Sequence, residues 1–152
     1  MTGDDRLRLL ALDEEDLAVI SAHVQDAVLQ VGDLAWLARE GRFVMPMNRF
    51  AWEAVPSGWF RRKDYQRRRA VLHFDRVTSV QYSGFDNHAR DRVLAILAIR
   101  FETGGAPSGQ IEILFSGDAS LRLAVECIEA RIGDLGPAWS TAHAPRHHAA
   151  PD

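Results

Sequence analysis

The sequence predicts an α+β domain built on an antiparallel sheet of six to seven strands, with a helix before the sheet and a helix after it. Residues 13–28 carry apolar side chains at helical spacing, whereas the segments that follow alternate apolar and polar residues and are separated by turn residues. The chain has 152 residues, of which 47% are hydrophobic and 26% are charged. Such a chain buries enough surface to fold as one domain without a disulfide or a metal.

The first predicted helix begins after Asp13, because a carboxylate at this position accepts hydrogen bonds from the free N–H groups of the first turn. Residues 14–16 are acidic and favour the positive end of the helix dipole, so we interpret them as a charged first turn and not as a catalytic or metal site. The apolar stripe consists of Leu17, Ile20, Val24 and Val28. The helix ends at Gly32 at the latest, or already near Asp26.

A hairpin follows the helix. The segments Asp33–Ala38 and Arg42–Trp52 alternate with period two, and Gly41 suits the left-handed position of the short loop between them. In the second segment Phe43, Met45 and Met47 share one face. Pro46 has no N–H to donate, so this strand is predicted to be an edge strand or to carry a bulge. Residues 53–68 are predicted to form a surface loop.

The middle of the chain supplies further strands. Arg68–Asp75 and Val77–Ser83 form either two strands or one long bulged strand. Arg92–Phe101 is apolar on both faces, so it is predicted to be central and covered on both sides, by the N-terminal helix or by a second subunit.

The last strands form a second hairpin. The glycine-rich turn at residues 104–109 leads into Gln110–Ser116, and Gly117-Asp118 is a two-residue turn into Ala119–Val125. The spacing of Ile128, Ile132 and Leu135 predicts a final helix over Glu126–Asp134.

Two resemblances follow from these segments. The order of elements, an antiparallel meander closed by a C-terminal helix, resembles the pleckstrin-homology-like roll. In addition, the stretches LLALDEEDLAVISAHVQDAV (9–28), RRRAVLHFDRV (67–77) and LAVECIEARIGDLGPAW (123–139) resemble an uncharacterised bacterial family of unknown function. The family resemblance implies a stand-alone cytosolic domain and carries over no catalytic residue.

The domain is predicted to span residues 7–139, with a flexible N-terminus at 1–6 and a disordered tail at 140–152. The single cysteine, Cys127, excludes an internal disulfide and any site with several cysteines. No apolar run approaches the roughly 20 residues of a membrane-spanning helix. The first residues also lack the pattern of a secretory signal, so we expect a cytoplasmic protein.

Motifs for chemistry are not found in the sequence. The glycines at 104–109 have the spacing of a phosphate-binding loop, but Gln110 and Ile111 stand where lysine and serine or threonine are required. Cys127 lies beside Glu126 and Glu129, which disfavour a thiolate. The six histidines form no pattern of metal ligands. We therefore expect no cofactor, no metal site and no catalytic site.

Charge is distributed unevenly, although the net charge is only −3. Residues 41–100 hold 12 basic and 5 acidic residues, whereas both ends of the chain are acidic. The densest basic segment is Arg61–Arg69, and loop aromatics precede it. The predicted interaction surface comprises Trp59, Phe60, Arg61, Arg62, Tyr65, Arg67, Arg68 and Arg69. The same segment can also be a solvated loop, or balance the acidic helix within the molecule.

These features predict a non-catalytic binding or scaffold module for a protein partner, with self-association through the apolar strand Arg92–Phe101. The alternative is a binder of an anionic ligand, such as a nucleotide, RNA or acidic lipid, through the basic segment. Nucleic acid is less favoured because the chain is acidic overall. An enzyme is the third reading, which needs His73, Asp75 and another titratable group in one cleft.

Overall fold

The computed structural model describes residues 6–50, 66–135 and 139–140. Within them it contains one α-helix, α1 (Glu14–Val24), one 3-10 helix, η1 (Val31–Asp33), and eleven strands. The strands are β1 (Arg8–Ala11), β2 (Val28–Gln30), β3 (Ala35–Leu37), β4 (Arg42–Phe50), β5 (Gln66–Phe74), β6 (Val77–Ser83), β7 (Val93–Thr103), β8 (Gly109–Phe115), β9 (Ala119–Val125), β10 (Ala130–Asp134) and β11 (Trp139–Ser140).

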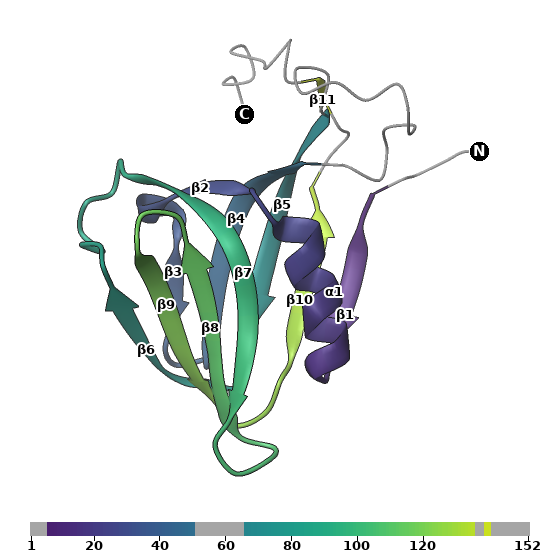
Figure 1. Cartoon of the computed structure of the whole chain (residues 1–152), viewed down its shortest axis with the longest axis vertical. Coiled ribbons are helices and arrows are strands. Elements are labelled where there is room, and N and C mark those ends of the chain that lie inside the picture. Colours follow the sequence, from purple (N-terminus) through teal and green to yellow (C-terminus); the bar gives the residue numbers. More distant parts are fainter. Residues whose placement is uncertain (1–5, 51–65, 136–138, 141–152) are drawn as a thin grey trace.

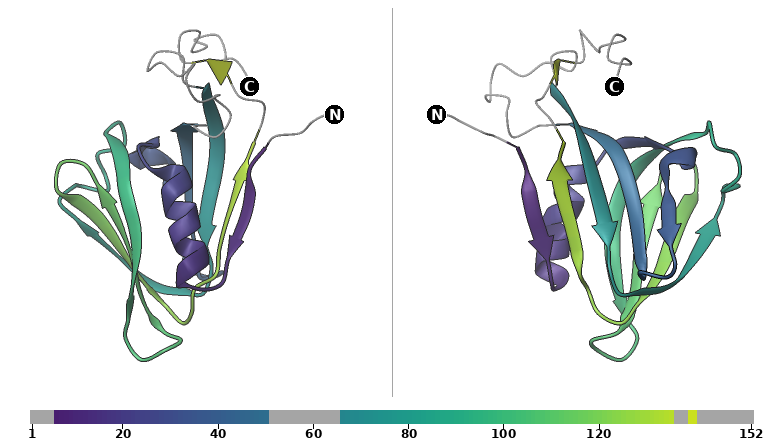
Figure 2. Two further views of the ribbon diagram at one scale, coloured as in Figure 1. Left: turned by 45° about the vertical axis from the view of Figure 1, so that its right-hand side comes forward. Right: turned by 180° about the vertical axis from the view of Figure 1, so that it is seen from behind.

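The strands form one open antiparallel sheet in the order β1-β10-β5-β4-β2-β7-β8-β9-β6, with β3 added at β4 and β11 added at β5. Figures 1 and 2 show that the sheet curves into two walls, one containing β1, β10, β5 and β4, the other containing β7, β8, β9 and β6. Helix α1 lies between β7 and β1, where the two walls diverge. The α+β class and the antiparallel sheet are therefore confirmed.

Two parts of the predicted architecture are wrong. The described residues contain eleven strands instead of six or seven, and the segment predicted as a C-terminal capping helix forms β10. The order of elements that suggested a pleckstrin-homology-like roll is therefore not confirmed.

The error at the C-terminus has a simple cause. Ile128 and Ile132 are four residues apart, and this spacing fits one face of a helix and one face of a strand equally well. In the structure Ile128, Ala130, Ile132 and Asp134 are all buried, which is the alternation of a strand. Leu135, the third apolar residue of the predicted helical face, is 59% exposed.

Helix α1 forms as its sequence signals predict. Asp13 is the N-cap, and its Oδ1 accepts a hydrogen bond from the Asp16 N–H at 2.8 Å. The helix ends at Val24, and Asp26 adopts a left-handed backbone conformation with φ 69°. Its inner face is fully buried in the core through Leu17, Ile20 and Val24.

Replacing Asp13 by alanine is expected to lower the free energy of unfolding by about 0.5–2 kcal/mol, because the Asp16 N–H loses its acceptor. Urea denaturation of the purified variant measures this change. Glu15→Ala is the matched control, since it removes a carboxylate from the same turn without removing the cap. Equal losses in the two variants would show that charge, and not the cap, matters here.

Both predicted hairpins are confirmed. Gly41 joins β3 to β4 with φ 63°, and Gly117 and Asp118 turn the chain between β8 and β9 with φ 77° and 62°. The predicted face of β4 is buried through Phe43, Met45 and Met47.

Pro46 is accommodated by a local gap in the sheet. β4 pairs with β5 over residues 43–50 and with β3 and β2 on its other side, so it is not an edge strand. On its other side β3 reaches only residues 42–44 and β2 meets only Asn48, so neither strand pairs with Pro46. The missing N–H of Pro46 therefore leaves no partner unsatisfied on that side.

Strand β7 is central, as predicted, and α1 covers one part of it. The Ser21 hydroxyl accepts a hydrogen bond from the Ile99 N–H at 2.9 Å, at a point beyond the reach of β2. Val93 and Leu97 are 58% and 49% exposed. Self-association through this strand stays a prediction.

Candidate functional site

The predicted interaction surface is only partly within the described residues. Trp59, Phe60, Arg61, Arg62 and Tyr65 lie outside them. Arg67, Arg68 and Arg69 lie in β5, near the end at which β11 pairs with that strand.

The three arginines of β5 do not share one surface. Arg68 is 2% exposed, whereas Arg67 and Arg69 are half-buried on the opposite face of the strand. The Arg67 guanidinium lies over the Phe50 ring, 4.9 Å from its centroid. Arg69 approaches Asp33 at 3.6 Å and donates to the Asn48 side chain at 3.3 Å. Strand alternation predicts this division, and the structure confirms it.

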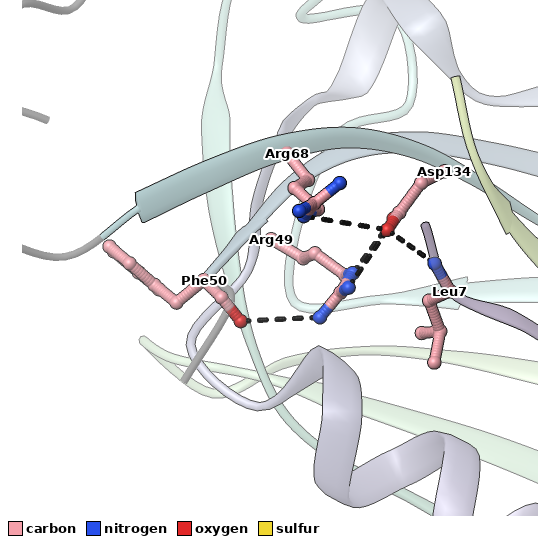
Figure 3. A network of polar contacts seen from close by, with 5 residues as sticks. All are labelled: Leu7, Arg49, Phe50, Arg68 and Asp134. Atoms are coloured by element: carbon pink, nitrogen blue, oxygen red, sulfur yellow. Dashed lines mark hydrogen bonds and ion pairs between the residues drawn. The ribbon is translucent and has the colours of Figure 1, made fainter. Parts of the chain in front are cut away.

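Arg68 belongs to a buried charge cluster with Arg49 and Asp134 (Figure 3). Arg49 donates to both oxygens of Asp134, from Nε to Oδ1 at 2.9 Å and from Nη2 to Oδ2 at 2.9 Å. The Arg68 Nε lies 3.8 Å from Oδ2. Oδ2 also accepts the Leu7 N–H at 2.8 Å, so one carboxylate connects β4, β5 and β10 to the residue that precedes β1.

This cluster was missed by the sequence analysis, although a signal was present. Each of its charged residues continues the buried face of its strand: Arg49 follows Met47, Arg68 precedes Ala70, and Asp134 follows Ile132, each at a spacing of two. Buried charged groups require a partner. Three charged residues that each lie on the apolar face of a strand are therefore predicted to lie next to one another in the core. The arrangement holds four segments at one end of the sheet and leaves the carboxylate inaccessible.

A shallow groove lies on the opposite, outer face of β5 and β10. Its volume is about 520 Å³, and β1, β5, β10 and Leu135 line it. The strand register places Arg8, Gly133 and Val71 side by side across the groove, and Leu10, Arg131 and His73 form the next row. A Cβ added to Gly133 meets nothing within 4 Å, so this glycine leaves a hollow between the side chains around it.

The charge of the groove is positive. Arg8 and Arg131 line it and form no ion pair or side-chain hydrogen bond with the described residues. The acidic residue of the described lining, Asp134, directs its carboxylate into the core. Other arginines do pair with carboxylates: Arg42 with Asp75, Arg76 with Glu129, and Arg100 and Arg122 with Glu112.

His73 and Asp75 are close to each other but do not line the same hollow. His73 Nε2 lies 3.6 Å from Asp75 Oδ2, and Arg42 donates to Asp75 Oδ1 at 2.7 Å. His73 lines the groove, whereas Asp75 lines a separate hollow near the β3–β4 turn. The cleft that an enzyme reading requires is therefore not formed by this pair.

Burial lowers the pKa of His73 below its usual value, and Asp75 opposes this effect. A histidine with a lowered pKa in the folded state binds its proton more readily when the chain is unfolded. The resulting contribution to stability is complete above the unfolded pKa of about 6.5 and is lost as the pH falls toward the folded pKa.

Between pH 7.5 and pH 5, the melting temperature of His73→Gln is therefore expected to fall less than that of the wild-type protein. The reason is that glutamine does not titrate. His88→Gln is the matched control, since His88 is exposed in a loop. Identical pH profiles for His73→Gln and the wild type would contradict the expectation.

Cys127 is a free, half-buried cysteine. Among the described residues, no three His, Cys, Asp or Glu side chains come together in a group able to hold a metal ion. No helix in this part of the chain is long and apolar enough to cross a membrane.

Comparison with known proteins gives a family. Residues 7–147 match the family model described as a protein of unknown function, DUF2948. The chain belongs to this family. The DUF2948 match contains the whole described part of β1 to β11, and therefore both the groove and the buried cluster. No curated protein and no solved structure matches the chain.

Proposed function

We propose that this DUF2948 domain is a non-catalytic binding module of the bacterial cytosol, and that its groove takes an acidic segment of a protein partner. The observation that carries the proposal is the pair Arg8 and Arg131, which flanks the hollow at Gly133 without a carboxylate partner among the described residues. A positive groove attracts carboxylates and disfavours basic ligands.

The chemistry of the walls favours a peptide over a nucleic acid or a small anion. Leu10 and Leu135 are 42% and 59% exposed, and Val71 lines the same groove. Apolar side chains at the centre of a surface with arginines beside them are typical of protein interfaces. Arg67, from the predicted basic segment, lies on the same face of β5, whereas Arg69 on that face pairs with Asp33.

The proposal is tested with blocked, fluorescent decapeptides in which every second residue is threonine. The positions between the threonines alternate between leucine and one other residue, which is glutamate, glutamine or lysine. Fluorescence anisotropy at low salt is expected to show the tightest binding for the glutamate peptide. Arg131→Glu is expected to weaken that binding about tenfold, because an attractive charge pair at a partly exposed site becomes repulsive.

Arg39→Glu is the matched control. Arg39 is exposed in the β3–β4 turn and forms no ion pair with the described residues. Arg39→Glu therefore changes the net charge equally at a residue that does not line the groove. Equal binding of the glutamate and lysine peptides, or equal losses in Arg131→Glu and Arg39→Glu, would overturn the proposal.

A further inference from the structure

The edge of the sheet beside the groove is open. Strand β1 is the outermost strand of its wall and, among the described residues, pairs with β10 alone (Figures 1 and 2). An unpaired edge offers a row of N–H and C=O groups to another extended chain.

The register identifies which groups of β1 are free. The Leu7 C=O accepts from the Asp134 N–H at 3.0 Å, so the backbone polar groups of Leu7 face β10. Along an antiparallel strand, the N–H and C=O of successive residues point alternately toward one neighbouring strand and away from it. The N–H and C=O of Leu9 and Ala11 therefore also face β10, and those of Arg8 and Leu10 point away from it. No described residue bonds to these outward groups.

We propose that the acidic segment binds as an additional strand, hydrogen-bonded to the free edge of β1. This inference rests on the proposed function and specifies how the partner is held. In such a strand every second side chain lies on the groove face, beside Arg8 and Leu10. On that face, acidic side chains contact the guanidinium groups of Arg8 and Arg131. The apolar side chains between them contact the exposed leucines, Leu10 and Leu135.

Charge selects the occupant of this edge. A second copy of the chain would pair β1 with β1 and add a second Arg8 to the same positive face, and charged residues on an edge strand oppose such pairing. The other edge of the sheet, β6, is different in character, since its exposed residues are uncharged and polar: Thr78, Ser79, Gln81 and Ser83. β6 contains no basic residue, and none of its apolar side chains is exposed. β1 is therefore the edge that fits an acidic, partly apolar segment.

The test uses a decapeptide in which every second residue is threonine and the residues between are glutamate and leucine in turn. Two N-methylated forms of this peptide are compared with it. One form is methylated at the glutamate and leucine positions, the other at the threonine positions. In strand addition only one alternate set of N–H groups faces β1, so one form is expected to lose binding while the other keeps it. Loss with the first form indicates an antiparallel added strand, and loss with the second form a parallel one.

A variant of the protein tests the same point from the other side. Leu10→Pro removes an outward N–H and leaves the β1–β10 ladder intact, because Leu10 does not donate to β10. Binding of the unmethylated peptide is expected to be at least about fivefold weaker in Leu10→Pro than in Leu10→Ala, which keeps the N–H and loses the side chain.

The outcomes separate the two proposals. If the peptide binds and depends on Arg131, but both methylated forms bind equally, strand addition is wrong and the binding module stands. If no glutamate peptide binds better than its lysine counterpart, both proposals fail. Sedimentation of the protein alone tests whether a second copy of the chain binds at the β1 edge. A dimer that Leu10→Pro dissociates would overturn the choice of partner. The peptide experiment decides the matter even if Leu10→Pro does not fold.

Discussion

Asp134→Asn is expected to lower the free energy of unfolding by about 3–5 kcal/mol, the usual cost of removing one partner from a buried ion pair. The substitution keeps the size of the side chain but removes its charge. Two buried guanidinium groups, those of Arg49 and Arg68, then lose the carboxylate that compensates them. Urea denaturation at pH 7.5 measures the loss, and circular dichroism shows whether the variant still folds.

Asp33→Asn is the matched control, because it makes the same chemical change at a carboxylate that pairs with Arg69 at a partly exposed site. Exposed pairs contribute about 0–1 kcal/mol, so this variant is expected to unfold almost as the wild type does. Similar stabilities for Asp134→Asn and Asp33→Asn would mean that the buried carboxylate does not compensate its arginines.

Gly133→Leu is expected to weaken binding of the glutamate–leucine peptide by at least about tenfold while leaving the fold intact. The added side chain fills the hollow between Arg8 and Val71, and its Cβ meets no atom of the described residues within 4 Å. Glycine in a strand costs roughly 0.5–1 kcal/mol relative to alanine, so the substitution is expected to maintain or raise the melting temperature. Anisotropy and thermal unfolding measure the two effects on one sample.

Gly133→Ala distinguishes the effect of side-chain volume from the effect of restricting the backbone. Alanine restricts the backbone as leucine does but leaves most of the hollow empty, so this variant is expected to bind nearly as well as the wild type. Unchanged binding in Gly133→Leu would place the peptide outside the groove.

The elements with local signals were predictable from the sequence. Helix α1 has its cap, its acidic first turn and its buried apolar residues within residues 13–24, and the two hairpins have glycine at the required turn positions. Such features need no knowledge of distant parts of the chain. Their bounds in the structure agree closely with the prediction.

Elements that depend on a distant partner were not predictable in the same way. β1 is four residues long, and only its last residue, Ala11, is fully buried. Its place in the sheet is set by β10, more than a hundred residues later, and β10 was itself predicted as helix. β2 has three residues and was assigned to the end of the first helix.

The candidate groove was missed for the same reason. The two arginines that line it, which form no ion pair with the described residues, lie in β1 and β10 and outside the dense basic segment Arg61–Arg69. Arg8 and Arg131 become neighbours only through the pairing of these strands. A count of charges along the chain cannot find such a site, whereas the strand register reveals it directly.

The bond between Leu7 and Asp134 spans 127 positions of the chain. Closing a loop of this length costs conformational entropy before the contact contributes to stability. During synthesis β1 leaves the ribosome before β10, so it lacks its sheet partner until β10 has also emerged. The groove, which both strands line, can therefore form only after residues 130–134 have been synthesised.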